Sequence, residues 1–342
     1  MADARDRDAA DPAGDDTRQR SSRAELREQL RERRADLERQ LEQRFEVGKA
    51  QLDAGRAQFE HAQEVIKART GRNLLGAIVI GLILGLSMLF SLIFVKALFM
   101  AFIAVIAALA CSELVWAVRR AQVLVPRIPT VIAALASVPA AYYFGVGGLF
   151  LSVLAGSVLV ALWRLTEQLI PSFRARPHRA LWLDLAAGTF IQAWVPLLAG
   201  FAVALTAEPG GQWWTVSFIV IVICADTGAY AAGLSFGRHP MAPVISPKKT
   251  WEGFAGAAVA VLIAGVLLAV LLLQVPWWVG AVLGAAILLS ATLGDLAESL
   301  VKRDLGVKDM SSWLPGHGGF LDRLDSMLPS SVVTFLLFAV FH

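Results

Sequence analysis

Cysteine is scarce in this sequence, and charge is scarce over most of its length. The two cysteines, Cys111 and Cys224, lie inside apolar runs, so we expect neither a disulfide framework nor a cysteine-based metal cluster. The N-terminus is rich in Asp and Arg and has no apolar core, so we expect no cleaved signal peptide. No nucleophile–base triad and no group of residues typical of nucleobase recognition is apparent. These absences argue against a disulfide-stabilised domain and against triad-type hydrolysis.

Hydrophobic residues make up 56% of the 342 residues, which is too much for an ordinary soluble protein. Residues 1–72 hold 16 of the 31 Lys and Arg residues and 16 of the 28 Asp and Glu residues. The uneven charge divides the chain into a charged extension, 1–72, and a transmembrane domain, 73–342. The net charge of +3 is a small difference between large numbers and indicates little about partners.

The N-terminal extension has two parts. Residues 1–22 lack periodic apolar positions, which is typical of disorder. From about 22 to 67, charges of alternating sign in a helix-forming composition predict a helix. Its leucine spacing drifts from a strict heptad, so a solvated helix without a specific partner is the alternative to partner binding or dimerisation.

The apolar runs predict an all-α, polytopic membrane protein, since a bilayer crossing needs about 20 residues. Basic residues cluster in alternate loops, which places the N-terminus and the motif-bearing loops in the cytoplasm and the chain in the cell membrane. Tryptophan pairs begin two spans on the outer side, as an interfacial belt does. We predict nine spans at about 74–94, 97–118, 128–144, 147–165, 183–206, 213–236, 254–274, 277–300 and 322–341.

The stretch from Gly294 to Ser326 concentrates charge between two apolar runs, at the membrane boundary. Ionisable residues in such places pair, face a cavity or bind something charged. Asp295 and Ser299 are four residues apart and Asp322 and Asp325 three apart, so each pair shares one face if helical. Hard oxygen ligands of this kind suit Mg²⁺, which is usually shared with substrate phosphates. The local pattern therefore predicts a metal-and-phosphate site at the membrane surface.

Two further motifs precede this stretch, and both belong to the motif-bearing part, 226–325. Asp226 lies inside the sixth predicted span, where a carboxylate is functional by default; a buried helix-to-helix hydrogen bond is the alternative. The next loop reads Ser246-Pro247-Lys248-Lys249-Thr250-Trp251-Glu252-Gly253. Adjacent lysines flanked by hydroxyls can bind a triphosphate, although a lysine pair also serves as a topology signal.

The run Ser299-x2-Lys302-Arg303-x4-Lys308-Asp309-x5-Pro315-x-His317-Gly318-Gly319-x2-Asp322-Arg323-x-Asp325 resembles the signature of the phosphatidate cytidylyltransferases, also called CDP-diacylglycerol synthases. The resemblance covers 74–342 in hydropathy, but its specific motifs lie between Asp226 and Asp325. It implies CTP as donor, phosphatidate as acceptor, CDP-diacylglycerol and pyrophosphate as products, and a role in phospholipid biosynthesis. The expected partners are therefore CTP, phosphatidate and the lipid bilayer, with a homodimer left open and no nucleic acid.

Roles for individual residues follow from this combination. The expected metal ligands are Asp295, Asp322 and Asp325, with Asp226 as a further candidate and Glu298 and Ser299 close by. The expected catalytic residues are these three aspartates with Lys302, Arg303, His317 and Arg323, although Lys302 and Arg303 are also plausible interfacial anchors. The expected substrate-binding residues are Ser246, Lys248, Lys249, Thr250, Glu252, Ser299, Lys308, Gly318 and Gly319.

The reaction needs no strong base, because a phosphate monoester is already ionised near neutral pH. Alignment and charge neutralisation by Mg²⁺, Lys and Arg then dominate catalysis. Three alternatives remain: another membrane phosphotransferase, such as a CDP-alcohol transferase or a polyprenol kinase; a transporter that uses intramembrane aspartates for ion coupling; and an inactive scaffold.

Overall fold

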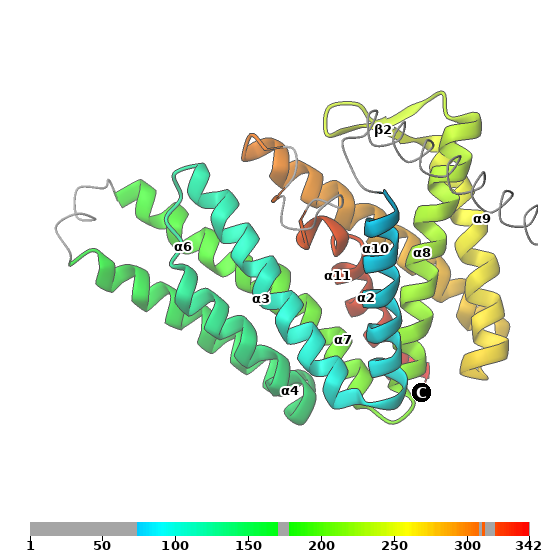
Figure 1. Ribbon diagram of the computed structural model, residues 1–342, viewed down its shortest axis with the longest axis horizontal. Helices are drawn as coiled ribbons and strands as arrows, with labels where there is room; N and C mark the ends of the chain where they lie inside the picture. Colours follow the sequence, from blue (N-terminus) through cyan, green and yellow to red (C-terminus); the bar gives the residue numbers. More distant parts are fainter. Residues whose placement is uncertain (1–73, 170–177, 308–309, 312–318, 342) are drawn as a thin grey trace, which may run out of the picture. The chain divides into compact units, whose positions relative to one another are not determined.

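The computed structural model describes residues 74–169, 178–307, 310–311 and 319–341. The predicted N-terminal extension, together with Lys308, His317 and Gly318, lies outside these residues. In chain order the elements are α2 (Leu74–Phe94), α3 (Lys96–Arg120), α4 (Arg127–Glu167), α6 (His178–Gln192), the π-helical turn η1 (Ala193–Leu197), α7 (Leu198–Ala207), α8 (Gly211–Phe236), β1 (Pro240–Ala242), β2 (Ser246–Thr250), α9 (Trp251–Leu268), the π-helical turn η2 (Ala269–Leu273), α10 (Trp277–Asp304), the 3-10 turn η3 (Leu321–Arg323) and α11 (Met327–Phe341). Figure 1 shows how the helices pack.

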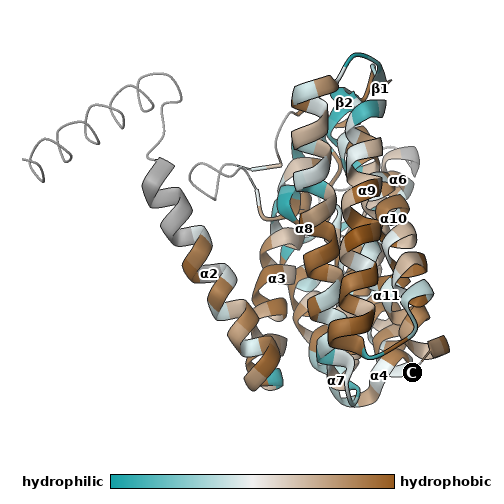
Figure 2. Ribbon diagram, turned by 90° about the vertical axis from the view of Figure 1, so that its right-hand side faces the viewer, coloured by the Kyte–Doolittle hydropathy of each residue, from teal (hydrophilic) through white to brown (hydrophobic). Residues whose placement is uncertain are grey.

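The expectation of a helical membrane protein is confirmed in its coarse form. Among the described residues, six helices are long and apolar enough to cross a bilayer: α3, α4, the continuous run of α6 to α7, α8, α9 with η2, and α10. Shorter apolar helices occur at Gly81–Phe94 and Met327–Phe341. Figure 2 shows hydrophobic residues along the helices and hydrophilic ones at the β1–β2 end. Nine crossings stay a prediction.

Helix α4 bends back on itself at Gly145, whose φ of 61° and ψ of −153° are not helical. A Cβ built on Gly156 would lie 2.7 Å from the Cβ of Ala133, so the segments before and after the bend run side by side. The positive φ is available to glycine at little steric cost. The bend falls between the predicted spans 128–144 and 147–165.

The polar stretch between α8 and α9 forms an antiparallel hairpin, which the sequence did not predict. Pro240 pairs with Thr250 and Ala242 with Ser246, with an irregularity between them. The Thr250 hydroxyl accepts a hydrogen bond from the Gly253 N–H at 3.1 Å and thereby caps the first turn of α9. The hairpin therefore places its second strand directly before the N-terminus of α9 (Figure 1).

Helix α10 ends just after its basic residues. Gly306 has a φ of 69°, the Gly306 N–H donates to the Arg303 carbonyl at 3.0 Å, and the Val307 N–H donates to the Lys302 carbonyl at 2.9 Å. This is the Schellman arrangement, in which a left-handed glycine stops the helix. The end of α10 is thus fixed by local sequence.

The buried core consists of two clusters that share α11. One contains Leu114, Val138 and Leu149 from α3 and α4, and reaches Leu328 of α11. The other contains Ile221, Val261 and Leu283 from α8, α9 and α10, and reaches Phe338 of α11. The last span was predicted to begin at 322, which is wrong: α11 begins at Met327, Asp322 lies in the 3-10 turn and Asp325 in the turn after it. The two aspartates therefore do not share a helix.

Candidate active site

A cavity of about 330 Å³ lies among α8, the β1–β2 hairpin, α9, α10 and the residue before α11. Its polar lining brings together several residues that were predicted separately from three motifs. They are Asp226, Lys248, Lys249, Thr250 and Asp295, and Ser326, which was not predicted as a site residue, also lines the cavity. Tyr230 and Thr292 add hydroxyl groups, and the rest of the lining is apolar or small, for example Ala229, Gly253 and Leu288. The cavity thus joins the Asp226 motif, the lysine loop and the signature stretch.

Opposite charges meet across this cavity. Lys249 Nζ lies 2.5 Å from Asp295 Oδ2, and both side chains are partly exposed, at 24% and 32%. The Ser299 hydroxyl donates to Asp295 Oδ1 at 3.3 Å, which confirms that the residues four apart on α10 share a face. Asp295 is therefore held from the strand side by Lys249 and from its own helix by Ser299.

Asp325 lies close to Asp295, although it comes from a different segment. Burial and then the negative charge of Asp295 raise the pKa of Asp325 above its ordinary value. The Ser326 N–H donates to Asp325 Oδ1 at 2.7 Å. A buried carboxylate beside a second negative charge favours a cation nearby.

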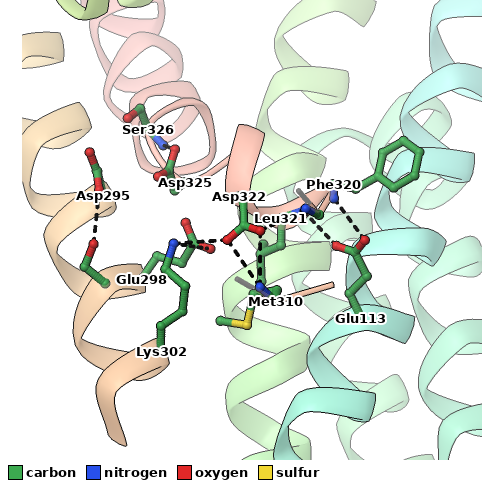
Figure 3. A network of polar contacts seen from close by, with 12 residues as sticks. Glu113, Asp295, Glu298, Lys302, Met310, Phe320, Leu321, Asp322, Asp325 and Ser326 are labelled. Atoms are coloured by element: carbon green, nitrogen blue, oxygen red, sulfur yellow. Dashed lines mark hydrogen bonds and ion pairs between the residues drawn. The ribbon is translucent and has the colours of Figure 1, made fainter. Parts of the chain in front are cut away.

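A second group of acidic side chains surrounds Glu298 of α10, which is more buried than Asp295 (Figure 3). Glu298 is 1% exposed, and neither of its carboxylate oxygens receives a hydrogen bond among the described residues. Lys302 Nζ lies 3.4 Å from Glu298 Oε1 and 3.0 Å from Asp322 Oδ1. Burial acts to raise the pKa of Asp322, but its contacts with Glu298, the Gly319 N–H and Lys302 outweigh burial and hold the pKa below its ordinary value. Lys302 therefore bridges two acidic side chains.

The acidic side chains of the site offer oxygen donors of the kind that Mg²⁺ prefers. Buried carboxylate oxygens without hydrogen-bond donors, such as those of Glu298, are what a bound cation would satisfy, and oxygen ligands suit Mg²⁺. Within the described ranges, however, no three Asp, Glu, His or Cys side chains converge as a metal site. The donor chemistry fits, and the ligand set stays a prediction.

Glu113 of α3 is a residue that the sequence reasoning missed. It is fully buried and accepts hydrogen bonds from the Ser311 hydroxyl at 2.5 Å and from the Phe320 and Leu321 N–H groups at 3.0 Å each. Figure 3 shows its carboxylate facing the start of η3. The available signal was a lone carboxylate in an apolar span, a pattern that marks function by default.

Other predicted residues have contacts of their own. Glu252 accepts from the Arg238 and His239 N–H groups at 3.1 and 3.2 Å and contacts His239 Nδ1 at 2.5 Å. It therefore links the start of α9 to the residues just before β1. Arg303 Nε donates to the Ile245 carbonyl at 3.4 Å, at the hairpin turn. Ser246 begins β2, and Arg323 is exposed at the end of η3.

The fold and the cavity together define a helical membrane protein with a site of mixed charge suited to a charged ligand. Residues 76–341 match the cytidylyltransferase family, and the chain belongs to this family of enzymes.

Three relatives confirm the resemblance inferred from the signature stretch. The phosphatidate cytidylyltransferase of Mycobacterium bovis (strain ATCC BAA-935 / AF2122/97) is 42% identical over 79% of this chain and 90% of its own length. That of Mycobacterium tuberculosis (strain ATCC 25618 / H37Rv) is 42% identical over 79% of this chain and 84% of its own. That of Mycobacterium leprae (strain TN) is 38% identical over 79% of this chain and 88% of its own.

Proposed function

We propose that this protein transfers the cytidylyl group of CTP to phosphatidate, with Mg²⁺, giving CDP-diacylglycerol and pyrophosphate for phospholipid biosynthesis. The observation that carries the proposal is the cavity in which Lys249 of the hairpin pairs with Asp295 of the signature stretch, with Asp226 and Lys248 alongside. Membership of the cytidylyltransferase family supports it.

In the proposed reaction a phosphatidate oxygen forms a bond to the α-phosphorus of CTP, and the bond from that phosphorus to pyrophosphate breaks. The attacking oxygen carries no proton near neutral pH, so the protein needs only to align the reactants and neutralise charge. Lys248 and Lys249 reach the cavity and would bind the triphosphate. Asp226, Asp295, Asp322 and Asp325 are the proposed Mg²⁺ ligands. Bound Mg²⁺ supplies charge stabilisation on the phosphoryl oxygens.

The lipid substrate would approach from a second, apolar cavity of about 400 Å³, which lies among α2, α3, η1, α7, α8 and the start of α11. Leu324, Met327 and Leu328 line this apolar cavity, whereas Ser326 lines the polar one. One short segment, 324–328, therefore separates the two. We propose that the acyl chains use the apolar side and the phosphate head reaches the polar side.

We also propose nine crossings, with the N-terminus and the motif-bearing loops in the cytoplasm. Both segments of α4, divided at Gly145, would count as crossings, and so would α2 and α11. The basic residues after α3, α8 and α10 support this orientation. Labelling of single cysteines placed in the hairpin and in the loop after α7 would test it.

The deciding experiment measures pyrophosphate release by purified protein with phosphatidate and Mg²⁺, comparing CTP with ATP, GTP and UTP. We expect release only with CTP and phosphatidate together, and loss of release with EDTA. Release of CMP would point instead to a CDP-alcohol transferase, and nucleotide-independent flux across liposomes to a transporter.

Two variants test the site itself. Asp295→Asn and Asp322→Asn should abolish turnover, whereas Asp304→Asn, an exposed residue in the last turn of α10, should not. The proposal fails if both site variants, shown to fold and insert, keep near-normal CTP-dependent turnover.

A further inference from the structure

Glu113 connects the first half of the chain to the segments that precede Asp322. Its Oε1 accepts from the Ser311 hydroxyl at 2.5 Å and the Phe320 N–H at 3.0 Å, and its Oε2 accepts from the Leu321 N–H at 3.0 Å. These bonds span 198 to 208 residues of sequence. One carboxylate thus receives donors from two separate segments, 310–311 and 319–321.

Asp322 holds the same two segments from the other side. Its Oδ2 accepts from the Gly319 N–H at 2.9 Å and the Met310 N–H at 3.2 Å, while Lys302 Nζ contacts Oδ1 at 3.0 Å. A Cβ built on Gly319 would lie 2.8 Å from Glu113 Oε2 and 3.1 Å from Asp322 Oδ2. Gly319 therefore lies between two carboxylates, and a side chain at this position would displace at least one of them.

We propose that Glu113 is a positioning residue for the cytidylyl transfer: by binding Ser311, Phe320 and Leu321 it fixes the direction in which Asp322 presents its carboxylate to Lys302 and Glu298. This inference rests on the proposed function. Among the described residues Glu113 lines neither cavity, so its proposed influence on the reaction passes through these hydrogen bonds. Partners that orient site residues commonly change activity by about 10–100-fold when removed.

The test compares Glu113→Gln with Ser112→Ala, a buried neighbour on the same helix that contributes none of these bonds. Glutamine keeps the shape but places an NH₂ donor against a backbone N–H donor. We expect kcat to fall about 10–100-fold, with little change in the KM for CTP, because Lys248 and Lys249 are untouched. Ser112→Ala should retain wild-type kcat.

Ser311→Ala removes the hydroxyl that donates to Glu113 and leaves the Glu113 carboxylate in place. If Glu113 acts through this segment, the fold-decrease in kcat of the double variant Glu113→Gln/Ser311→Ala should be smaller than the product of the fold-decreases of the two single variants. Ser311→Ala also keeps the proposal testable if Glu113→Gln does not fold.

Hydrogen exchange gives a readout that does not depend on activity. In Glu113→Gln, amides within 319–325 should exchange faster while those of α8, α9 and α10 keep wild-type protection. The proposal is overturned if Glu113→Gln keeps wild-type turnover per folded molecule, or if its exchange rises uniformly over all helices. If the wild-type protein itself releases no pyrophosphate, the proposed function fails, and the exchange comparison alone decides whether Glu113 fixes the segment.

Discussion

Helices α9 and α10 approach each other through glycines, and this contact supports the relative position of Lys249 and Asp295. A Cβ built on Gly284 would lie 2.5 Å from the Val261 carbonyl oxygen, and Gly265 and Gly280 meet each other's backbone in the same way. Since heavy atoms pack best at about 3.5–4.0 Å, Gly284→Ala should force the helices apart by about 1 Å.

The loss of stability caused by the steric contact at Gly284 can be separated from the change in helix propensity by a matched substitution. Gly147→Ala, in α4, places its new methyl group where no atom lies within 4 Å. Both substitutions gain helix propensity, by up to about 1 kcal/mol in a helix interior and by less at Gly147, which follows the break at Gly145, so a Gly284→Ala protein less stable than Gly147→Ala reports overpacking, about 1–3 kcal/mol. At about 2–4 °C per kcal/mol, the thermal midpoint of Gly284→Ala should lie a few degrees below that of Gly147→Ala.

The assay is thermal unfolding in detergent, followed by pyrophosphate release from the folded protein. Gly284→Ala should also lower kcat/KM for CTP, because α9 follows the strand that carries Lys249 and α10 carries Asp295. A Gly284→Ala protein as stable as Gly147→Ala would refute the reasoning, since close glycine contact would then not set the spacing of α9 and α10.

Three further predictions concern single contacts. Arg164 donates to Asp184 Oδ2 at 2.8 and 3.0 Å with both residues buried, so Asp184→Asn should cost about 3–5 kcal/mol, and a clearly lower thermal midpoint would show it. Thr250→Ala should cost about 1 kcal/mol through loss of the α9 cap, whereas Thr250→Ser should keep wild-type stability in the same assay. Lys249→Met should raise the KM for CTP about tenfold or more, as expected when a charged hydrogen bond to a phosphate is lost, and an unchanged KM would exclude Lys249 from nucleotide binding.

Much of the helical framework was predictable because bilayer-length apolar runs are a strong signal. The predicted spans 128–144 and 147–165 leave a gap at Gly145, and the helix breaks there because glycine adopts a positive φ at little steric cost. The hairpin was missed because β1 has three residues and β2 has Pro247 and two lysines, which carry little β propensity. Glu252 adds contacts with the Arg238 and His239 N–H groups, 14 and 13 residues earlier, which strand propensity does not predict.

The sequence indicated which residues line the site better than it indicated how they are arranged. Asp226, Lys249 and Asp295 were named from separate motifs, and the structure places them around one cavity. Spacing suggested that Asp322 and Asp325 share a helical face, but the 3-10 turn sends Asp322 toward Lys302 and leaves Asp325 near Asp295. Periodicity rules apply within one helix, so they do not predict contacts across a turn.

The long separation between Glu113 and its partners has a consequence for biosynthesis. At translation rates of about 5–20 residues per second, the 198 residues between Glu113 and Ser311 take roughly 10–40 s to make. Throughout that interval α3 holds a carboxylate without the donors that later satisfy it, which is costly within a membrane. The polar contacts of Glu113 can therefore form only after Ser311, Phe320 and Leu321 have been made, and a chain that ends before Ser311 would lack all three of these donors.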